Sequence, residues 1–324
     1  MSEPTKHLIT GAAGFIGSHL ADRLLERGAT VVGIDNLKLG RRDNLARALA
    51  CSRFHFHVAD VNDVPACAKL VAEESKPRPF DMVWHLAANS DIRAGVADPD
   101  VDLRDTFHTT HSLLKVLRGQ GIKRIAFAST SAIYGMHPAR LSEDLGPLFP
   151  ISNYGAMKLA SEAVLSAALE SFLECVWIFR FPNVVGSRAT HGAIYDFAQK
   201  LKKNPAELEV LGDGSQEKPY FHVADLVEAM LYIVDHACEP LNYFNIGTAD
   251  SITTVRYLAE AVVRSMRPGA RIRYTGGNKG WVGDVPKFSY SIEKLKKLGW
   301  SPRLTSNQAV DRAVEEIVQE VQRA

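Results

Sequence analysis

The first half of the chain alternates short apolar runs with longer segments in which apolar residues recur every three or four positions. Most of the short runs are continuous, as expected for strands that are covered on both faces. The predicted strands are residues 7–10, 30–35, 54–58, 82–86, 124–128 and 175–181. The predicted helices are residues 15–27, 64–74, 101–118 and 154–172, with Gly28 and Gly121 where C-caps fall. This alternation indicates βαβ units, and therefore an α/β fold with a doubly wound parallel sheet.

The pattern is less regular after residue 181. Shorter helices are predicted over residues 194–203, 225–236, 255–267, 292–298 and 307–321. Loops rich in glycine and proline, such as "LGDGSQEKPY" and "GGNKGWVGDVP", separate them. We therefore expect a first domain over residues 1–180, to which 220–247 return, and a smaller mixed α/β lobe over 181–324. This lobe is expected to close over the carboxyl edge of the sheet, where open α/β sheets bind ligands.

Composition narrows the possible partners. The 324 residues are 46% hydrophobic and 23% charged, with a formal net charge of +1, which indicates neither nucleic-acid nor membrane-surface binding. No apolar leader and no long apolar run occurs. The four cysteines are scattered without a C-x-x-C pair, which predicts free thiols in a cytoplasmic protein; no metal is expected.

The segment "LITGAAGFIGSHL" places three glycines between a predicted strand and a predicted helix. Gly11 permits a tight turn, Gly14 lets a pyrophosphate approach the backbone, and Gly17 lets the helix pack on the strand. Phe15 and Ile16 open the helix, whose amino end faces the phosphates with its partial positive charge. The pattern predicts a Rossmann-type dinucleotide site in the first domain.

Acids at the ends of the next two strands refine this site. Asp35, followed by Asn36, can accept hydrogen bonds from the adenosine ribose, and its charge would repel a 2′-phosphate. NAD is therefore favoured over NADP. Asp60 and Val61 follow the third strand, where they can contact the adenine. Asp60 is equally well explained as a helix N-cap.

Tyr154 and Lys158 in "SNYGAMK" are four residues apart at the start of a helix, and so lie on one face. A strand ending in the hydroxyls of Ser129, Thr130 and Ser131 precedes them in the sequence. A free tyrosine titrates near 10, so a phenol poised near 7 needs roughly 4 kcal/mol of preference for phenolate. One cation about 5 Å away supplies about 3 kcal/mol at an effective dielectric constant of ~20.

Six motifs occur along the chain: "TGAAGFIG", "HLAA", the hydroxyl cluster before "YG", Y-x-x-x-K, "RFPNVVG" and "GDGSQ…HVAD". With these motifs the chain resembles the extended short-chain dehydrogenase/reductase family. This family includes nucleotide-sugar epimerases, dehydratases and decarboxylases. The resemblance implies that Tyr154 is the acid/base, Lys158 its electrostatic partner, and Thr130 the hydroxyl that bridges Tyr154 to the sugar. It also implies that the backbone of Leu86, Ala87 and Ala88 lines the nicotinamide.

The residues after Thr130 bear on the reaction. Family members that eliminate water resemble T-D-E here, and decarboxylating members resemble T-S-E, whereas this chain has Ser131 and Ala132. Without a carboxylate to remove the C5 proton, a 4-keto sugar is expected to survive and be reduced again. This predicts an NAD-dependent 4-epimerase acting on a UDP-hexose or UDP-hexuronate. A dehydratase, decarboxylase or reductase of the same family is the alternative, and a non-catalytic dinucleotide-binding regulator is a further one.

Substrate contacts are less clear from the sequence. The residues expected to bind substrate are Ser90, Arg93, Ser129, Thr130, Asn183, Arg188, Lys218 and Asp284. Arg93 is as well explained by a surface ion pair with Asp91 or Asp98, and Ser129 by hydrogen bonding at the strand end. The chain departs from the family pattern at three places: it has Lys218-Pro219 for Arg-Asp, Trp281 for an arginine and Thr106 for an asparagine. These departures weaken the assignment of a specific nucleotide. Relatives pair the helices predicted over 101–118 and 154–172 into a four-helix bundle, which implies a homodimer.

Overall fold

The computed structural model describes residues 4–137, 140–248, 251–277, 285 and 287–323, which form two compact units. The first unit consists of Met1–Ile133, Ser152–Arg180 and Ile233–Phe244. The second unit consists of Tyr134–Ile151, Phe181–Tyr232 and Asn245–Ala324. Within the described ranges, no helix combines the length and the apolar character needed to cross a membrane.

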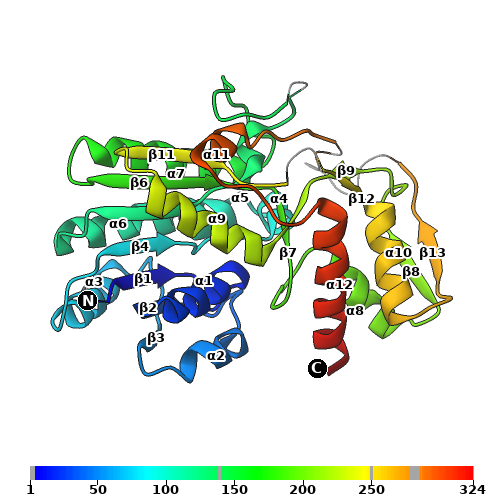
Figure 1. Cartoon of the computed structure of the whole chain (residues 1–324), viewed down its shortest axis with the longest axis horizontal. Helices are drawn as coiled ribbons and strands as arrows, with labels where there is room; N and C mark the ends of the chain where they lie inside the picture. Colours follow the sequence, from blue (N-terminus) through cyan, green and yellow to red (C-terminus); the bar gives the residue numbers. More distant parts are fainter. Residues whose placement is uncertain (1–3, 138–139, 249–250, 278–284, 286, 324) are drawn as a thin grey trace. The chain divides into compact units, whose positions relative to one another are not determined.

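The first unit is built on a seven-stranded sheet in the order β11-β6-β5-β4-β1-β2-β3 (Figure 1). These strands are β1 (Lys6–Thr10), β2 (Thr30–Asp35), β3 (Phe54–Val58), β4 (Met82–His85), β5 (Arg124–Ala128), β6 (Cys175–Arg180) and β11 (Leu241–Asn245). All five pairings from β6 across to β3 are parallel. The order reverses between β1 and β4, so the predicted doubly wound sheet is confirmed.

Helices cover both faces of this sheet. On one face α3 (Val64–Ser75), α6 (Thr109–Gln120) and α7 (Asn153–Leu169) share a buried core with alternate residues of the strands, such as Val32 and Ile125. The residues between them, such as Val31 and Ile9, are also buried, and α1 (Phe15–Glu26) packs on β1 and β2. Burial on both faces explains why the strands read as continuous apolar runs.

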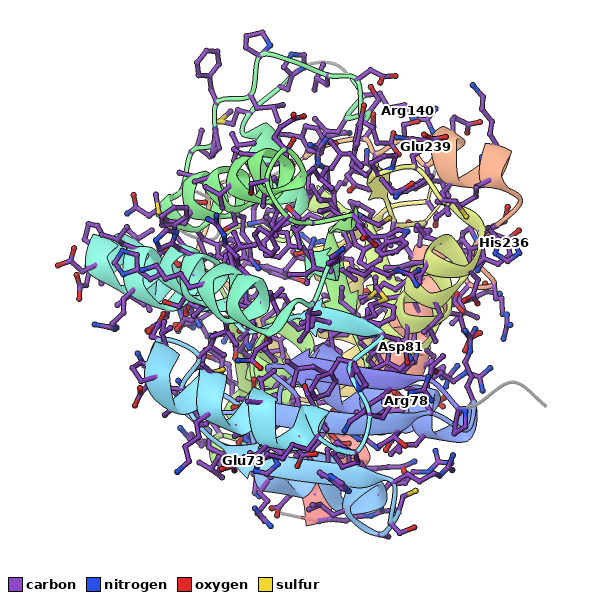
Figure 2. The ribbon with its side chains drawn as sticks, turned by 90° about the vertical axis from the view of Figure 1, so that its left-hand side faces the viewer. Glu73, Arg78, Asp81, Arg140, His236 and Glu239 are labelled. Carbon is purple, nitrogen blue, oxygen red and sulfur yellow. The ribbon has the colours of Figure 1, made fainter. Side chains whose placement is uncertain are left out.

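The remaining elements of the first unit are short. They are η1 (Arg42–Leu45), α2 (Ala46–Leu49), α4 (Ile92–Ala97), α5 (Pro99–Asp102), η2 (Leu103–His108) and most of η3 (Ser131–Tyr134). The amino end of β1 is fixed by Asp81 in the α3–β4 loop, which accepts the Lys6 N–H (2.7 Å) and pairs with Arg78 (3.2 Å; Figure 2). Gly121 ends α6 in the left-handed conformation (φ 69°), which confirms the predicted C-cap.

The single helix predicted over residues 101–118 is wrong in detail. The chain there forms α5, a π-helical stretch η2 and then α6. The hydroxyls of Thr109 and Thr110 donate to the Thr106 carbonyl (2.8 and 3.4 Å), competing with the backbone ladder. Such side-chain bonds widen a helix locally, and π-turns of this kind are frequent at functional sites.

The second unit joins three helices to short strand pairs. α8 (Ala193–Lys203), α10 (Val255–Met266) and α12 (Ser306–Arg323) enclose its apolar core. The strand pairs are β7 (Asn183–Val185) with β10 (Tyr220–His222), β8 (Glu207–Val210) with β13 (Arg271–Tyr274), and β9 (Glu217–Lys218) with β12 (Thr253–Thr254). α11 (Glu293–Leu298) also belongs to it, and α9 (Val223–His236) begins in it. The predicted mixed α/β character of this part is confirmed.

Candidate active site

The turn between β1 and α1 brings two backbone segments unusually close. Gly11 has a φ of 74°, and a Cβ there would lie 2.7 Å from the Ala87 backbone nitrogen. A Cβ on Gly17 would lie 2.1 Å from the Gly11 carbonyl oxygen. Gly14 is the N-cap of α1 and has no side chain to satisfy the first N–H groups of the helix, so they remain available to an anion. The turn therefore fits a dinucleotide pyrophosphate at the start of α1, beside Phe15 and Ile16.

Asp35 ends β2 and is held by the same turn. Its carboxylate accepts the N–H of Ala13 (2.9 Å) and of Leu37 (2.8 Å). Burial raises the pKa of Asp35, and these hydrogen bonds oppose that rise. Asp35 is thus fixed at the strand end, where a ribose hydroxyl is expected to bind.

Asn36 and Asp60 lie at neighbouring strand ends. The Asn36 amide donates to Asp60 Oδ2 (3.1 Å), and Asp60 Oδ1 accepts the Asn62 N–H (2.8 Å). The N-cap of α3 is Asp63, which accepts the Ala66 N–H, so the capping explanation of Asp60 does not hold. Asp60 and its buried neighbour Val61 remain predicted adenine contacts.

The loop after β4 is tied to the end of β1. Leu86 donates its N–H to the Thr10 carbonyl (3.0 Å), and the Ala87 N–H reaches Thr10 Oγ1 (3.4 Å). Leu86, Ala87 and Ala88 are half-buried, so this backbone borders the glycine turn and is partly open to solvent. That arrangement agrees with the predicted nicotinamide lining, which stays a prediction.

The three predicted catalytic residues meet at the carboxyl end of β5. Ser152 caps α7 by accepting the Gly155 N–H (3.1 Å), which places Tyr154 in the first turn and Lys158 one turn later. Lys158 Nζ lies 5.8 Å from the centre of the Tyr154 ring and donates to the Ala128 carbonyl (2.6 Å). Tyr154 is hydrogen-bonded to Thr130, whose Oγ1 also accepts the Ala132 N–H (3.1 Å).

Burial controls the electrostatics of this cluster. It raises the pKa of Tyr154 above the usual value; the charge of Asp102 adds to the rise, and the Thr130 hydrogen bond opposes it. Burial also lowers the pKa of Lys158 to about 7, against the raising effects of Glu162 and Asp102. The two groups share a poorly solvated site, so each is sensitive to nearby charge.

Asp102 is a buried acid near this cluster that sequence reasoning did not single out. Its Oδ1 accepts from the amide of Asn89 (2.8 Å) and the hydroxyl of Thr106 (3.4 Å). A Cβ on Gly95 would lie 1.7 Å from Asp102 Oδ2, so only glycine leaves room for the carboxylate. The spacing of Asp102 and Thr106 is the one sequence signal for this contact, and four other acids between residues 91 and 105 obscure it.

Ser129 and Arg93 have other partners in this structure. Ser129 is fully buried, and its hydroxyl donates to the Glu162 carboxylate. The exposed Arg93 makes the anticipated ion pair with Asp91 (3.7 Å), and Ser90 is exposed. Their roles as substrate ligands stay predictions.

The other predicted substrate residues belong to the second unit. The Asn183 amide donates to the Pro219 carbonyl (3.5 Å), and Lys218 lies in β9. The Arg188 N–H donates to both carboxylate oxygens of Glu320 (3.0 and 2.9 Å). Asp284 and Trp281 lie outside the described residues.

The glycine turn, the acid ending β2 and the Tyr154–Lys158 pair define a dinucleotide-dependent oxidoreductase site of the extended short-chain dehydrogenase/reductase type. Residues 7–247 match the NAD dependent epimerase/dehydratase family. The chain belongs to this family, and it is an enzyme that uses NAD.

Individual relatives are similar along nearly the whole chain. The UDP-glucose 4-epimerase of Mycolicibacterium smegmatis is 31% identical, with 95% of this chain and 97% of that protein covered. The UDP-glucuronate 4-epimerase of Thermodesulfobacterium geofontis is 26% identical, with 95% and 94% covered. A solved structure of the UDP-glucose 4-epimerase of Thermotoga maritima with UDP-glucose is 28% identical, covers 98% and 100%, and has a TM-score of 0.84.

Proposed function

We propose that this protein is an NAD-dependent nucleotide-sugar 4-epimerase that acts on a UDP-hexose or a UDP-hexuronate. The observation that carries the proposal is the meeting of Thr130, Tyr154 and Lys158 at the end of β5, where Ser131 and Ala132 follow and no carboxylate does. The three named relatives, all 4-epimerases of UDP-sugars, support the same reaction.

In the proposed reaction Tyr154 removes the proton from the C4 hydroxyl and later returns it. NAD, held by the glycine turn and Asp35, would supply the hydride acceptor and donor for C4 and, in its oxidised form, a positive charge. Thr130 is hydrogen-bonded to Tyr154 and would keep the phenol oxygen directed at the sugar. Lys158 supplies the chain's own positive charge to the phenolate.

The lack of a basic side chain at the two positions after Thr130 favours inversion over elimination. Ser131 and Ala132 cannot remove a carbon-bound proton, because neither side chain is basic. Among the described residues, Asp102 and Glu162 are carboxylates near the catalytic pair. Asp102 is 0% exposed and its Oδ1 is engaged by Asn89 and Thr106, and Glu162 is held by Arg180. A keto sugar in this site is therefore expected to be reduced again at C4.

A substrate panel tests the reaction directly. The purified protein is incubated with UDP-glucose, UDP-glucuronate and their N-acetyl analogues, and the products are followed by proton NMR. We expect a mixture of C4 epimers and no net formation of NADH. Loss of water or carbon dioxide would identify a dehydratase or decarboxylase, and accumulation of NADH would identify a dehydrogenase.

Substitution Tyr154→Phe tests the acid/base assignment. It removes the phenol oxygen but keeps the ring, so turnover is expected to fall by about 10²–10⁴-fold. NAD binding, measured by calorimetric titration, is expected to stay within about threefold of wild type, because the glycine turn and Asp35 are untouched. Undiminished turnover in this variant contradicts the assignment.

We also propose a cytoplasmic homodimer that forms through a four-helix bundle. On α7, Ala156, Ala160, Ala163 and Ala167 form a stripe of small side chains that are at least partly exposed. Leu103 and Phe107 in η2 are also partly exposed. Small and apolar side chains on neighbouring helices favour close packing against a second copy. All four cysteines are free thiols, as is usual in a reducing compartment.

A further inference from the structure

The face of α7 that carries the catalytic pair also carries a third ionisable residue. Tyr154, Lys158 and Glu162 are spaced by four residues, so their side chains follow one another along a single stripe of the helix. Lys158 and Glu162 are 2% and 5% exposed. A buried carboxylate one turn beyond a buried ammonium acts on it with little screening by water.

Glu162 is held firmly by two partners from the sheet. Arg180, at the end of β6, donates through Nε (3.1 and 3.2 Å) and through Nη2 (2.7 Å) to its carboxylate. Ser129, one residue past the end of β5, donates its hydroxyl to the same carboxylate. The Arg180 guanidinium also packs over the Tyr243 ring at 5.4 Å. The pair gives the buried Glu162 carboxylate a partner of opposite charge.

These contacts fix the strand end that presents Thr130. Ser129 is bound through its hydroxyl to Glu162 and through its N–H to the Phe179 carbonyl (2.8 Å). The next residue is Thr130, which is hydrogen-bonded to Tyr154. Glu162 therefore connects α7, β5 and β6 where the catalytic hydroxyl leaves the sheet.

In the part of the chain that the structure describes, four ionisable groups act on or contact Lys158. Glu162 and Asp102 raise its pKa, in that order of size, against the lowering caused by burial. His85 is fully buried and its pKa is lowered to about 3, so it is neutral and adds no opposing charge. Tyr154 is neutral until it loses its proton to become a phenolate. Glu162 is therefore the main group that favours the ammonium form of Lys158.

We propose that Glu162 is a positioning residue of this enzyme: it keeps Lys158 charged and, through Ser129, holds Thr130 in line with Tyr154. The inference rests on the proposed function, because the charge of Lys158 matters to catalysis only if Tyr154 acts as the acid/base. A neutral lysine cannot stabilise a phenolate, so loss of the Glu162 charge is expected to restrict activity at high pH.

The two effects of Glu162 are separated by two single substitutions. Glu162→Gln keeps the shape and the acceptor oxygen for Ser129 but removes the charge, whereas Ser129→Ala keeps the charge and removes the strand contact. With E162Q the alkaline limb of the kcat profile is expected to move to lower pH by about one unit. With S129A the rate is expected to fall severalfold at every pH without movement of either limb. Glu170→Gln, at the exposed C-cap of the same helix, is the matched control.

The charge of Lys158 is also measured without turnover. NMR titration of the lysine Cε–Hε signals, with the Lys158 signal assigned by its loss in K158M, reports the protonation of Lys158 directly. We expect E162Q to lower the titration midpoint and E170Q to leave it in place. If the wild-type protein makes no epimer, the proposed function fails, yet this titration still tests the effect of Glu162. An unchanged midpoint in E162Q overturns the inference.

A control for folding is needed, because E162Q leaves the buried Arg180 without its acid. Breaking such a pair by one substitution is strongly destabilising, whereas replacing both partners is much less so. The double variant E162Q/R180Q is therefore measured beside the single one. It is expected to show the same lowered Lys158 midpoint at a melting temperature closer to wild type. A wild-type midpoint in a folded double variant contradicts the proposal.

Discussion

At the scale of single residues, Gly17 shows how little room the cofactor turn leaves. Because a Cβ at this position would come within 2.1 Å of the Gly11 carbonyl oxygen, Gly17→Ala must push α1 away from the turn. We expect NAD affinity to fall by at least about tenfold, and stability to fall by about 1–3 kcal/mol, as for other overpacked sites. Calorimetric titration with NAD and denaturant unfolding measure the two effects.

Gly119→Ala is the matched control for this substitution. Gly119 lies in α6, and a Cβ there would have no heavy atom within 4 Å. The variant is therefore expected to bind NAD normally and to be as stable as wild type or up to about 1 kcal/mol more stable. Equal affinities for NAD in G17A and G119A would contradict the role given to Gly17.

Some residues of the candidate site were indicated by the sequence, and others were not. The common face of Tyr154 and Lys158 was predictable, because it follows from a spacing of four on a helix, whereas Thr130 was chosen among three hydroxyls by the resemblance to the family; the roles of all three stay predictions. Asp102 was not singled out, since burial of an acid depends on partners from other elements, here Asn89 and Gly95. Glu162 had a usable signal, the repeated spacing of four after Tyr154, but its tie to Ser129 requires the folded sheet.

At the scale of elements, α12 is anchored by a carboxylate with several partners. Glu316 accepts the Ser187 N–H (2.9 Å) and bonds to the ring of His222 (3.2 Å) and to Arg312 (2.9 Å). His222 Nδ1 accepts the Ala224 N–H, so Nε2 carries the proton that is donated to Glu316. Although burial opposes ionisation, these bonds lower the pKa of Glu316 to about 2. Glu316 thus joins α12 to β10 and to the loop after β7.

The lowered pKa predicts a pH-dependent contribution to stability. A carboxyl whose folded pKa lies below its unfolded value stabilises the fold fully above the unfolded value, and the contribution is lost as pH falls through the folded one. For Glu316 this window runs from about 5 down to 2, and the contribution is about 2–3 kcal/mol. Urea unfolding of wild type and Glu316→Gln is expected to differ by this amount at pH 7 and by less at pH 4. A difference that does not depend on pH contradicts the assignment.

The periodicity of apolar residues predicted many of the strands and helices but not all of them. The six predicted strands and most of the predicted helices agree with the structure to within about two residues, because apolar patterns persist through each of them, whereas β11 and the short strands of the second unit were not predicted. The break at η2 was not predicted, since the hydroxyl bonds of Thr109 and Thr110 to one carbonyl group accompany it without changing the spacing of the apolar residues. The segment Tyr134–Ile151 belongs to the second unit although both its neighbours belong to the first, and no local pattern marks such an excursion.

At the scale of the whole molecule, the proposed dimer makes a prediction for α7. Ala163 is exposed and nine residues from Tyr154, which places it on the opposite side of the helix. Ala163→Arg would put a charged side chain into the proposed bundle and leave the catalytic face unchanged. We expect the wild type to elute as a dimer in size-exclusion chromatography with light scattering, and A163R to elute as a monomer that still binds NAD.

The control for the dimer places the same charge elsewhere. Glu73 is exposed on α3, away from the α7 stripe, and Figure 2 shows it at the surface of the first unit. Glu73→Arg changes the net charge by more than A163R does, so a general effect of charge on association would appear in both variants. If only A163R dissociates, the alanine stripe of α7 lies in the interface. An arginine without a partner is costly only where association removes the water that hydrates it. A monomeric wild type, or a dimeric A163R, would remove the basis for the bundle and leave the cluster of Thr130, Tyr154 and Lys158, which lies within the first unit, unaffected.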